Sequence, residues 1–203
     1  MMPDNIEILR RLGKGKSGVS YLARYKNKKV VYKEMHDESV PYYRFEKPKI
    51  ELEIAAYHTL KKQKIAIPRL ISYCKDYLIK EYIEGKTLTE QLVEKKLNDE
   101  LFFMALSWEK TLKKNNMNID YFPSNFVMNN HTLYYIDYEL NPYTEQWNFR
   151  NWGIYYWLNG EGFKKFLATN DAKYINENEQ GIPVKNNRIN AERARILKEW
   201  DDQ

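Results

Sequence analysis

Cysteines and long hydrophobic runs are almost absent from this sequence. Cys74 is the only cysteine among 203 residues, which excludes an intramolecular disulfide and a cysteine-ligated metal cluster. We expect its thiol to be a buried structural group rather than a redox centre. No apolar run approaches the roughly 20 residues that a membrane helix requires, and residues 1–5 lack a signal-peptide pattern. The sequence therefore predicts a soluble cytoplasmic protein.

The chain also lacks internal repeats and low-complexity tracts. A hydrophobic content of 43% can supply the core of one domain, or of one domain with two lobes. The formal net charge is +5, but the lysines are scattered and alternate with glutamates. This charge favours anionic partners without choosing among nucleotides, nucleic acids and phosphorylated substrates. The 17 tyrosines and five tryptophans predict a small core built from large side chains.

Glycines cluster between two predicted strands near the start of the chain. Residues 6–12 have the pattern of a strand, and alternating β-branched and aromatic residues predict another at 19–25. The Gly-x-Gly-x-x-Gly segment between them suits a flap whose backbone approaches phosphates, because no Cβ intervenes. A simple hairpin turn explains the same glycines. The segment consists of Gly13, Lys14, Gly15, Lys16, Ser17 and Gly18.

A third predicted strand carries Lys33, and a helix beginning near Pro48 follows it. Glu51 and Glu53 lie about 200° apart around the axis of that helix, so only one of them can face the strands. The alternatives are an exposed strand lysine and two solvated glutamates. The intervening segment, residues 36–47, is predicted to be a loop.

Two further strands, at residues 69–74 and 77–85, are predicted to form a hairpin that closes a five-stranded antiparallel sheet. Lys80 lies in the second of them, where a buried ammonium would be costly without a partner. We expect Lys80 to extend to solvent, or the register of this strand to be shifted by one residue. Helices follow the sheet, beginning with a capping box at Thr87 and a longer amphipathic helix capped by Asn98.

The last third of the chain combines an aromatic block, a polar loop and a helix. The aromatic block, residues 147–157, is explained better by packing of a small helical region than by stacking on bases. Residues 171–185 are predicted to be a polar loop. Residues 190–200 are predicted to be helical, with Arg193 and Arg195 on a solvated basic face.

One stretch in the middle of the chain contains three short polar side chains that can converge on one point. Asp120 and Asn125 lie at the two ends of a loop that Pro123 interrupts, and Asp137 follows the β-like run at residues 132–136. Oxygen ligands of this kind suit Mg²⁺, which takes few protein oxygens together with phosphate oxygens. The remaining carboxylate can accept a proton from a hydroxyl. The alternative is that these are ordinary turn residues.

In this order, the signals resemble the protein-kinase-like superfamily. The resemblance spans residues 6 to about 153 and rests on the glycine segment, Lys33, the helix glutamate and the spacing of Asp120, Asn125 and Asp137. It implies an α+β, two-lobed fold that forms a single domain over residues 1–203. The N-lobe, residues 1–83, would hold the five-stranded antiparallel sheet plus one helix. The C-lobe, residues 84–203, would be reduced and mainly helical.

The resemblance also implies roles for these residues. Lys33, paired with Glu53 or failing that with Glu51, would bind the phosphates of ATP beneath the glycine segment. Asn125 and Asp137 would hold Mg²⁺, and Asp120 would orient the acceptor hydroxyl and take its proton. The residues that would bind ATP are Gly13, Gly15, Lys16, Ser17, Gly18, Lys33 and the backbone groups of Glu81 and Ile83 at the adenine edge.

Several positions depart from the pattern of regulated protein kinases. Asn118 stands where His usually precedes the catalytic Asp, and Tyr138 and Glu139 replace the usual Phe-Gly after Asp137. No Ala-Pro-Glu triplet follows. The chain therefore resembles the compact Rio-type kinases and the aminoglycoside and sugar phosphotransferases more than receptor kinases. We expect a catalytic centre without an activation-loop switch.

The sequence thus predicts an ATP-dependent phosphotransferase that transfers the γ-phosphate to a hydroxyl. Protein Ser/Thr, sugar and small-molecule acceptors all remain open. One alternative is a pseudokinase, a nucleotide-binding or scaffolding module without turnover, which Asn118, Lys80 and the missing substrate platform favour. Another is a basic nucleic-acid-associated protein, for which only the charge and the aromatic residues speak. We expect no membrane span.

Overall fold

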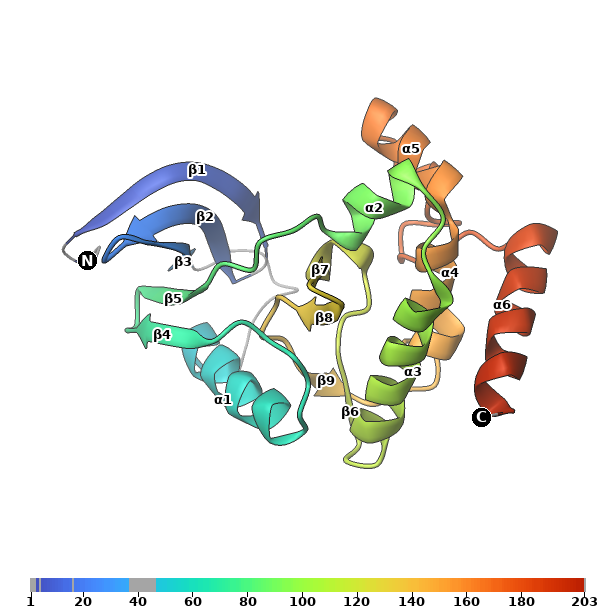
Figure 1. The fold of residues 1–203 in the computed structure, drawn as a ribbon, viewed down its shortest axis with the longest axis horizontal. Coiled ribbons are helices and arrows are strands. Elements are labelled where there is room, and N and C mark those ends of the chain that lie inside the picture. Colours follow the sequence, from blue (N-terminus) through green and yellow to red (C-terminus); the bar gives the residue numbers. More distant parts are fainter. Residues whose placement is uncertain (1–2, 4, 16, 37–46, 203) are drawn as a thin grey trace. The chain divides into compact units, whose positions relative to one another are not determined.

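The computed structural model describes residues 3, 5–15, 17–36 and 47–202. Lys16 and all but the ends of the predicted loop at residues 36–47 lie outside the described residues. Contacts divide the chain into two compact units, Met1–Glu84 (unit 1) and Gly85–Gln203 (unit 2). The ribbon in Figure 1 shows that both helices and strands are present, so the predicted α+β class is confirmed. No helix in the described part of the chain is both long and apolar enough to cross a membrane.

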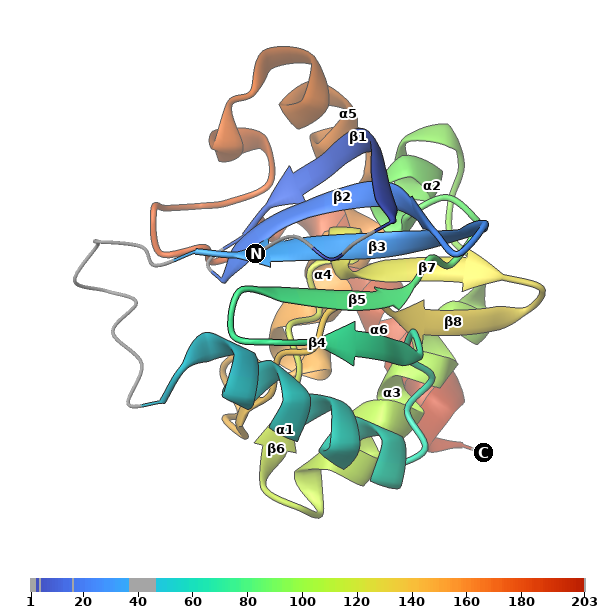
Figure 2. The same cartoon turned by 90° about the vertical axis from the view of Figure 1, so that its left-hand side faces the viewer.

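Unit 1 contains a five-stranded antiparallel sheet and a helix, as predicted. The strand order is β1-β2-β3-β5-β4, and every neighbouring pair is antiparallel (Figure 2). The helix follows directly after Pro48. The elements are β1 (Ile6–Lys14), β2 (Gly18–Tyr25), β3 (Lys28–Met35), α1 (Lys49–Lys62), β4 (Leu70–Tyr73) and β5 (Tyr77–Glu81).

Local chemistry explains the hairpin between β2 and β3. Lys26 and Asn27 form its two-residue turn, with φ of 49° and 60°. Two successive positive φ values are typical of the turn whose twist matches that of the flanking strands. One face of the sheet then buries a small cluster of Ala23, Val30, Tyr32 and Ile79. Burial of these residues fixes the register, since a one-residue slip would turn them to the other face.

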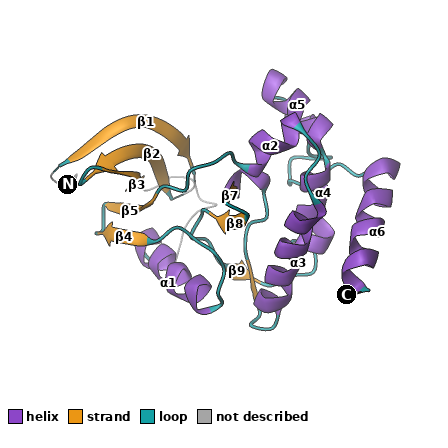
Figure 3. Cartoon of the chain, viewed as in Figure 1, coloured by secondary structure: helices purple, strands orange, loops and turns teal. Residues whose placement is uncertain are grey.

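Among its described residues, unit 2 has five α-helices and two short antiparallel strand pairings (Figure 3). The strand β6 (Met117–Asn118) pairs with β9 (Asn141–Pro142), and β7 (Phe126–Asn129) pairs with β8 (Thr132–Tyr135). The helices are α2 (Leu88–Glu94), α3 (Asp99–Lys113), α4 (Ile154–Leu158), α5 (Gly160–Thr169) and α6 (Asn187–Asp201).

Predicted capping residues begin two of these helices. The Thr87 hydroxyl accepts from the backbone N–H of Glu90 at 3.2 Å, and the Glu90 carboxylate accepts from the N–H of Thr87 at 2.7 Å. The Asn98 side chain accepts from the N–H of Glu100 at 2.7 Å at the start of α3. These bonds satisfy donors that have no partner within the helix. The capping box and the second cap are therefore confirmed.

Aromatic side chains fill the core of unit 2. Trp157 and Phe149 meet edge to face with ring centroids 4.8 Å apart, and Phe126 contacts Trp157 with centroids 5.0 Å apart. Edge-to-face contacts of this kind add to the stabilisation from burial. The preference for packing over base stacking is confirmed for Phe149 and Trp157, because each is no more than 1% exposed.

Two predictions about single residues are wrong. The Cys74 thiol is half-buried rather than buried, and its Sγ accepts from the backbone N–H of Asp76 at 3.4 Å. The face of α6 that carries the arginines is not merely solvated. The Arg193 Nε donates to the carbonyl of Arg150 at 2.7 Å, and Arg195 contacts Asp99 at 2.7 Å. Both arginines hold α6 to other elements of unit 2.

Candidate functional site

The glycine segment of unit 1 forms the turn between β1 and β2. Gly15 donates its backbone N–H to the carbonyl of Gly18 at 2.9 Å. A Cβ on Gly18 would lie 2.2 Å from the carbonyl oxygen of Glu34, so packing against β3 requires glycine there. A Cβ on Gly13 or Gly15 would meet nothing within 4 Å, and neither has a positive φ. The fold therefore requires glycine at position 18 but not at positions 13 and 15.

Lys33 and Glu53 form a buried ion pair in unit 1, as predicted. The Lys33 Nζ on β3 lies 2.5 Å from the Glu53 Oε1 on α1, and the two residues are 6% and 5% exposed. Glu51 is exposed, which removes it as the fallback partner. Burying two opposite charges costs desolvation energy that their attraction offsets only with good geometry. A buried ion pair of this kind adds little to the stability of the fold. It also places charged groups in the protein interior, where such groups are rare.

Ser17 makes an unpredicted contact with this ion pair. Its hydroxyl donates to the same Oε1 of Glu53 at 2.5 Å, so the glycine turn, β3 and α1 meet at one carboxylate oxygen. The other oxygen, Oε2, is buried and makes no hydrogen bond within the described part of the chain. No local pattern predicts this contact, because Ser17 and Glu53 are 36 positions apart in the chain.

Lys80 is buried in the sheet, at 5% exposure, instead of extending to solvent. Pairing places Lys80 opposite Val31 and Leu78 opposite Lys33. Residues paired directly opposite share a face, and alternate residues along a strand share one too. Lys80 therefore lies on the same face of the sheet as Lys33. The first of the two expectations for Lys80 is wrong.

The segment after β5 was predicted to bind adenine through its backbone. Glu81 uses its N–H in the sheet, donating to the carbonyl of Arg69 at 2.9 Å. Ile83 is buried, and no backbone hydrogen bond joins it to another described residue. The backbone N–H of Glu81 is therefore engaged within unit 1, whereas the N–H of Ile83 makes no backbone hydrogen bond among the described residues.

In unit 2, the loop from Asp120 to Asn125 is closed by its own polar groups. The Asp120 carboxylate accepts from the N–H of Phe122 at 3.0 Å, and the Asn125 Nδ2 donates to the carbonyl of Asp120 at 3.3 Å. Asp120 and Asn125 are therefore neighbours at the two ends of the loop. Because its amide nitrogen is engaged, Asn125 offers its Oδ1 as the ligand atom.

The hairpin that follows brings Asp137 to the same place. The N–H of Ile136 donates to the carbonyl of Asn125 at 2.8 Å, and the Asp137 Oδ1 accepts from the N–H of Tyr138 at 2.9 Å. Because Ile136 is hydrogen-bonded to Asn125, Asp137, which follows Ile136 in the chain, also lies close to Asn125. The predicted convergence of Asp120, Asn125 and Asp137 within unit 2 is present.

Tyr135 lies near both carboxylates, those of Asp120 and Asp137, and was not singled out from the sequence. Burial raises the pKa of its phenol well above the ordinary value, and the nearby charges of Asp137 and Asp120 raise it further. The hydroxyl donates to the carbonyl of Glu139 at 3.2 Å. Tyr135 ends β8, two residues before Asp137, and that closeness is visible in the sequence.

Residues of the aromatic core contact the loop from Asp120 to Asn125 and fix its position. The Trp157 Nε1 donates to the carbonyl of Tyr121 at 2.8 Å, and a Cβ on Gly153 would lie 2.4 Å from the Cβ of Tyr121. Asn118 is also buried, and its Nδ2 donates to the carbonyl of Trp147 at 2.8 Å. Asn118 therefore ties the start of the loop to a distant segment. Neither Trp157 nor Trp147 could have been linked to this loop from local sequence.

The donor set of unit 2 fits a magnesium ion that also takes phosphate oxygens. Asn125 and Asp137 supply one amide oxygen and one carboxylate, which is the small set of hard ligands that Mg²⁺ accepts from a protein when phosphates complete its shell. The described residues contain no group of three or more His, Cys, Asp or Glu side chains that could hold a metal ion. The set is therefore too small for a site made of protein groups alone.

No protein-family model matches this chain, and no curated protein matches its sequence. Its function must therefore be inferred from the geometry of the two units.

Proposed function

We propose that this protein is an ATP-dependent phosphotransferase and that units 1 and 2 correspond to the N-lobe and C-lobe of a kinase-like fold. The observation that carries the proposal is the buried ion pair between Lys33 and Glu53. A buried pair adds little net stability compared with apolar side chains of the same size. Its retention next to a glycine turn is explained by a need for an oriented ammonium that binds phosphate.

The glycine turn supports the same assignment. Packing does not require glycine at positions 13 and 15, whereas close approach of a ligand to the backbone does explain it. Lys33 would then contact the α- and β-phosphates, and the N–H of Ile83 would meet the adenine edge. Ser17 and Gly18 complete the turn, and Lys16, outside the described residues, would add positive charge to it.

Unit 2 supplies the second half of the chemistry. Asn125 and Asp137 would hold Mg²⁺, which when bound neutralises charge on the phosphates. Asp120 would orient the acceptor hydroxyl. The hydroxyl oxygen forms a bond to the γ-phosphorus, the bond from that phosphorus to the β–γ bridging oxygen breaks, and ADP leaves with the bonding electrons. The hydroxyl proton passes to Asp120. Positioning and charge stabilisation supply most of the rate.

The acceptor is a hydroxyl of a protein Ser/Thr, a sugar or another small molecule. The fixed loop of unit 2 supports catalysis rather than mere nucleotide binding, because Asp120 is held by bonds to Phe122 and Asn125. A general base must be held within hydrogen-bond reach of the proton that it abstracts.

Two measurements test this proposal. The first is the shift in unfolding temperature when Mg·ATP binds, and the second is transfer of the labelled γ-phosphate together with release of ADP. Replacing Asp120 by Asn should lower transfer and ATP hydrolysis at least about 100-fold and leave the Mg·ATP shift intact. Asp137→Ala should abolish the magnesium dependence of that shift. Asp202→Asn removes an exposed carboxylate at the end of α6 and serves as the control. Near-normal turnover in Asp120→Asn would overturn the role of Asp120.

A second candidate is a nucleotide-binding pseudokinase or scaffold, and the burial of Lys80 favours it. Lys80 adds a second ammonium to the face of the sheet that carries Lys33. An extra charge at that face changes how a nucleotide would be held. A shift with Mg·ATP but no transfer and no ADP release would select this candidate. Absence of any nucleotide-dependent shift would contradict both.

A further inference from the structure

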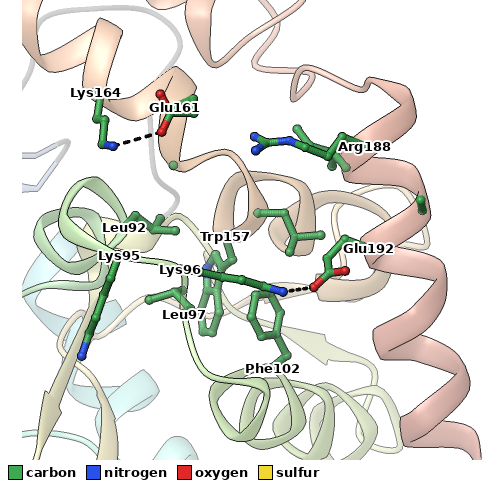
Figure 4. A pocket seen from close by; sticks show the side chains of 14 residues that line it. Leu92, Lys95, Lys96, Leu97, Phe102, Trp157, Glu161, Lys164, Arg188 and Glu192 are labelled. Carbon is green, nitrogen blue, oxygen red and sulfur yellow. Dashed lines mark hydrogen bonds and ion pairs between the residues drawn. The ribbon is translucent and has the colours of Figure 1, made fainter.

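Unit 2 contains a cavity of about 440 Å³ that the proposed phosphotransfer does not use (Figure 4). All of its lining residues belong to unit 2. They come from α2, the connection to α3, the start of α3, α4, α5 and α6. Its volume lies in the range of small-molecule sites.

The walls of the cavity are apolar. Leu92, Leu97, Phe102 and Trp157 line it, and each is no more than 5% exposed in the fold. Phe102 and Trp157 contact each other edge to face with centroids 5.9 Å apart. These side chains are held by the core of unit 2, so the wall is formed before any ligand arrives. A preformed apolar wall suits the hydrocarbon or aromatic part of a ligand.

The charges at the rim do not balance. Four cations, Lys95, Lys96, Lys164 and Arg188, line the cavity together with two acids, Glu161 and Glu192. Glu161 pairs with Lys164 at 3.0 Å, and Glu192 pairs with Lys96 and with Arg195. The side chains of Lys95 and Arg188 make no hydrogen bond or ion pair to another residue in the described ranges. Two positive charges therefore remain at the rim.

Arg188 is the better placed of these two cations. In Figure 4 its side chain reaches from α6 toward Glu161, whereas Lys95 extends in another direction. The positive charge of Arg188 helps to lower the pKa of Glu161, after the larger effect of Lys164. The guanidinium has the planar fork that binds a carboxylate with two parallel hydrogen bonds.

Another part of the rim lies one turn along α6 from Arg188 and is fixed by a separate network. Arg195 contacts Glu192 at 2.9 Å, Glu199 at 2.7 Å and Asp99 at 2.7 Å. These contacts hold α6 to the start of α3, and the three carboxylates leave that part of the rim with a net negative charge even when Lys96 is counted. An anion entering the cavity is therefore drawn toward Arg188 rather than toward Glu192.

We propose that this cavity binds a small amphipathic carboxylate. Its apolar part lies against the wall formed by Leu92, Leu97, Phe102 and Trp157, and its carboxylate meets Arg188. The proposal is independent of the phosphotransferase assignment, because no residue of the cavity takes part in that chemistry.

Calorimetric titration of the full chain with phenylbutyrate and with phenylbutyramide tests the proposal. The two probes share an apolar body and differ in the charged group. We expect the carboxylate to bind at least about tenfold more tightly than the amide, since a charge-assisted bidentate pair is stronger than a neutral hydrogen bond. Arg188→Gln should remove this preference. Lys198→Gln removes a charge from an exposed position on the same helix outside the cavity and should leave it unchanged.

A second pair of variants locates the bound probe. Ala191 lines the cavity and is exposed, whereas Ala194 is exposed on the same helix outside it. Ala191→Phe should weaken binding of phenylbutyrate at least about tenfold by filling the cavity, and Ala194→Phe should not. Equal binding of acid and amide, binding of neither, or equal effects of the two alanine variants would each overturn the proposal. Helix content and thermal unfolding of every variant show whether the fold is kept.

Discussion

The described parts of units 1 and 2 each bury one glutamate, and the two are held in different ways. Glu53 in unit 1 is 5% exposed and accepts from the Lys33 ammonium and the Ser17 hydroxyl at 2.5 Å each. Glu109 in unit 2 is 4% exposed and accepts from the backbone N–H of Arg150 at 3.0 Å. The partner of Glu53 is a charged side chain, whereas that of Glu109 is a backbone group at the start of a helical segment.

This difference separates a candidate functional group from a structural one. Burial is the main cause that raises the pKa of Glu109, and the nearby Arg150 N–H and guanidinium only partly oppose it. Glu109 satisfies a backbone donor that would otherwise lack a partner. Glu53 instead orients the ammonium of Lys33, which neither α1 nor the sheet needs for its backbone hydrogen bonds. Burial alone therefore does not identify a functional carboxylate, and the chemical nature of its partner does.

The largest expected effect follows from breaking the ion pair of unit 1. Lys33→Met leaves the Glu53 charge buried and uncompensated, and it should lower the free energy of unfolding by about 3–5 kcal/mol. The double variant Lys33→Met, Glu53→Leu should recover most of that stability, because an apolar pair of similar volume replaces the ions. Neither variant should transfer phosphate. Chemical denaturation and the labelled-phosphate assay measure the two effects.

A matched control for Lys33→Met lies on the same strand. Lys29 pairs with Glu84 at 2.8 Å, and both side chains are more than half exposed. Lys29→Met should therefore cost less than about 1 kcal/mol. If Lys29→Met and Lys33→Met destabilised the protein equally, burial would not distinguish these two ion pairs. Phosphate transfer retained by the double variant would contradict the role given to Lys33.

An intermediate effect is expected in the glycine turn that carries Ser17 to Glu53. Gly18→Ala should lower the free energy of unfolding by about 1–3 kcal/mol, because its Cβ would lie 2.2 Å from the Glu34 carbonyl. Gly15→Ala should change it by less than about 0.5 kcal/mol, since a Cβ there meets no atom within 4 Å. The same Gly15 variant should weaken the thermal shift with Mg·ATP. A Gly15 variant that binds nucleotide normally would favour the simple hairpin turn.

The smallest effect is expected at Glu109. Glu109→Gln keeps an oxygen acceptor for the Arg150 N–H and should change the free energy of unfolding by less than about 1 kcal/mol near neutral pH. A carboxyl whose pKa is raised by folding binds its proton more tightly in the folded state. Its contribution to stability is therefore present below the unfolded value of 4.5 and is lost as the pH rises through the folded value.

Urea denaturation at several pH values from about 4 to 8 measures this contribution. The wild type should lose stability relative to Glu109→Gln as the pH rises. Glu179→Gln, which changes an exposed loop carboxylate, serves as the control. A wild type that gains stability relative to Glu109→Gln as the pH rises would contradict the assignment of burial as the main cause.

The elements that follow local rules could be predicted. Alternation and turn residues predicted the strands of unit 1, and the turn after β2 lies at Lys26–Asn27. The Thr87 capping box and the Asn98 cap follow from residues within one helical turn of each other. The spacing of Asp120, Asn125 and Asp137 gave their convergence, because the intervening hairpin of β7 and β8 is short and regular.

Contacts between distant residues could not be predicted in this way. Burial of Lys80, the bond from Ser17 to Glu53 and the docking of Arg193 and Arg195 depend on segments that the sequence does not place side by side. The cavity bounded by α2, α5 and α6 belongs to the same class, since its lining residues are spread from position 92 to position 192.

The sequence by itself determined the periodic elements, the caps and the identity of the polar groups, because these depend on neighbouring residues along the chain. Only the tertiary structure decided which of these groups are buried and what they contact. The difference between Glu53 and Glu109 has this origin. The desolvation of a carboxylate and the charge of its partner are set by residues that folding brings together from far apart in the chain.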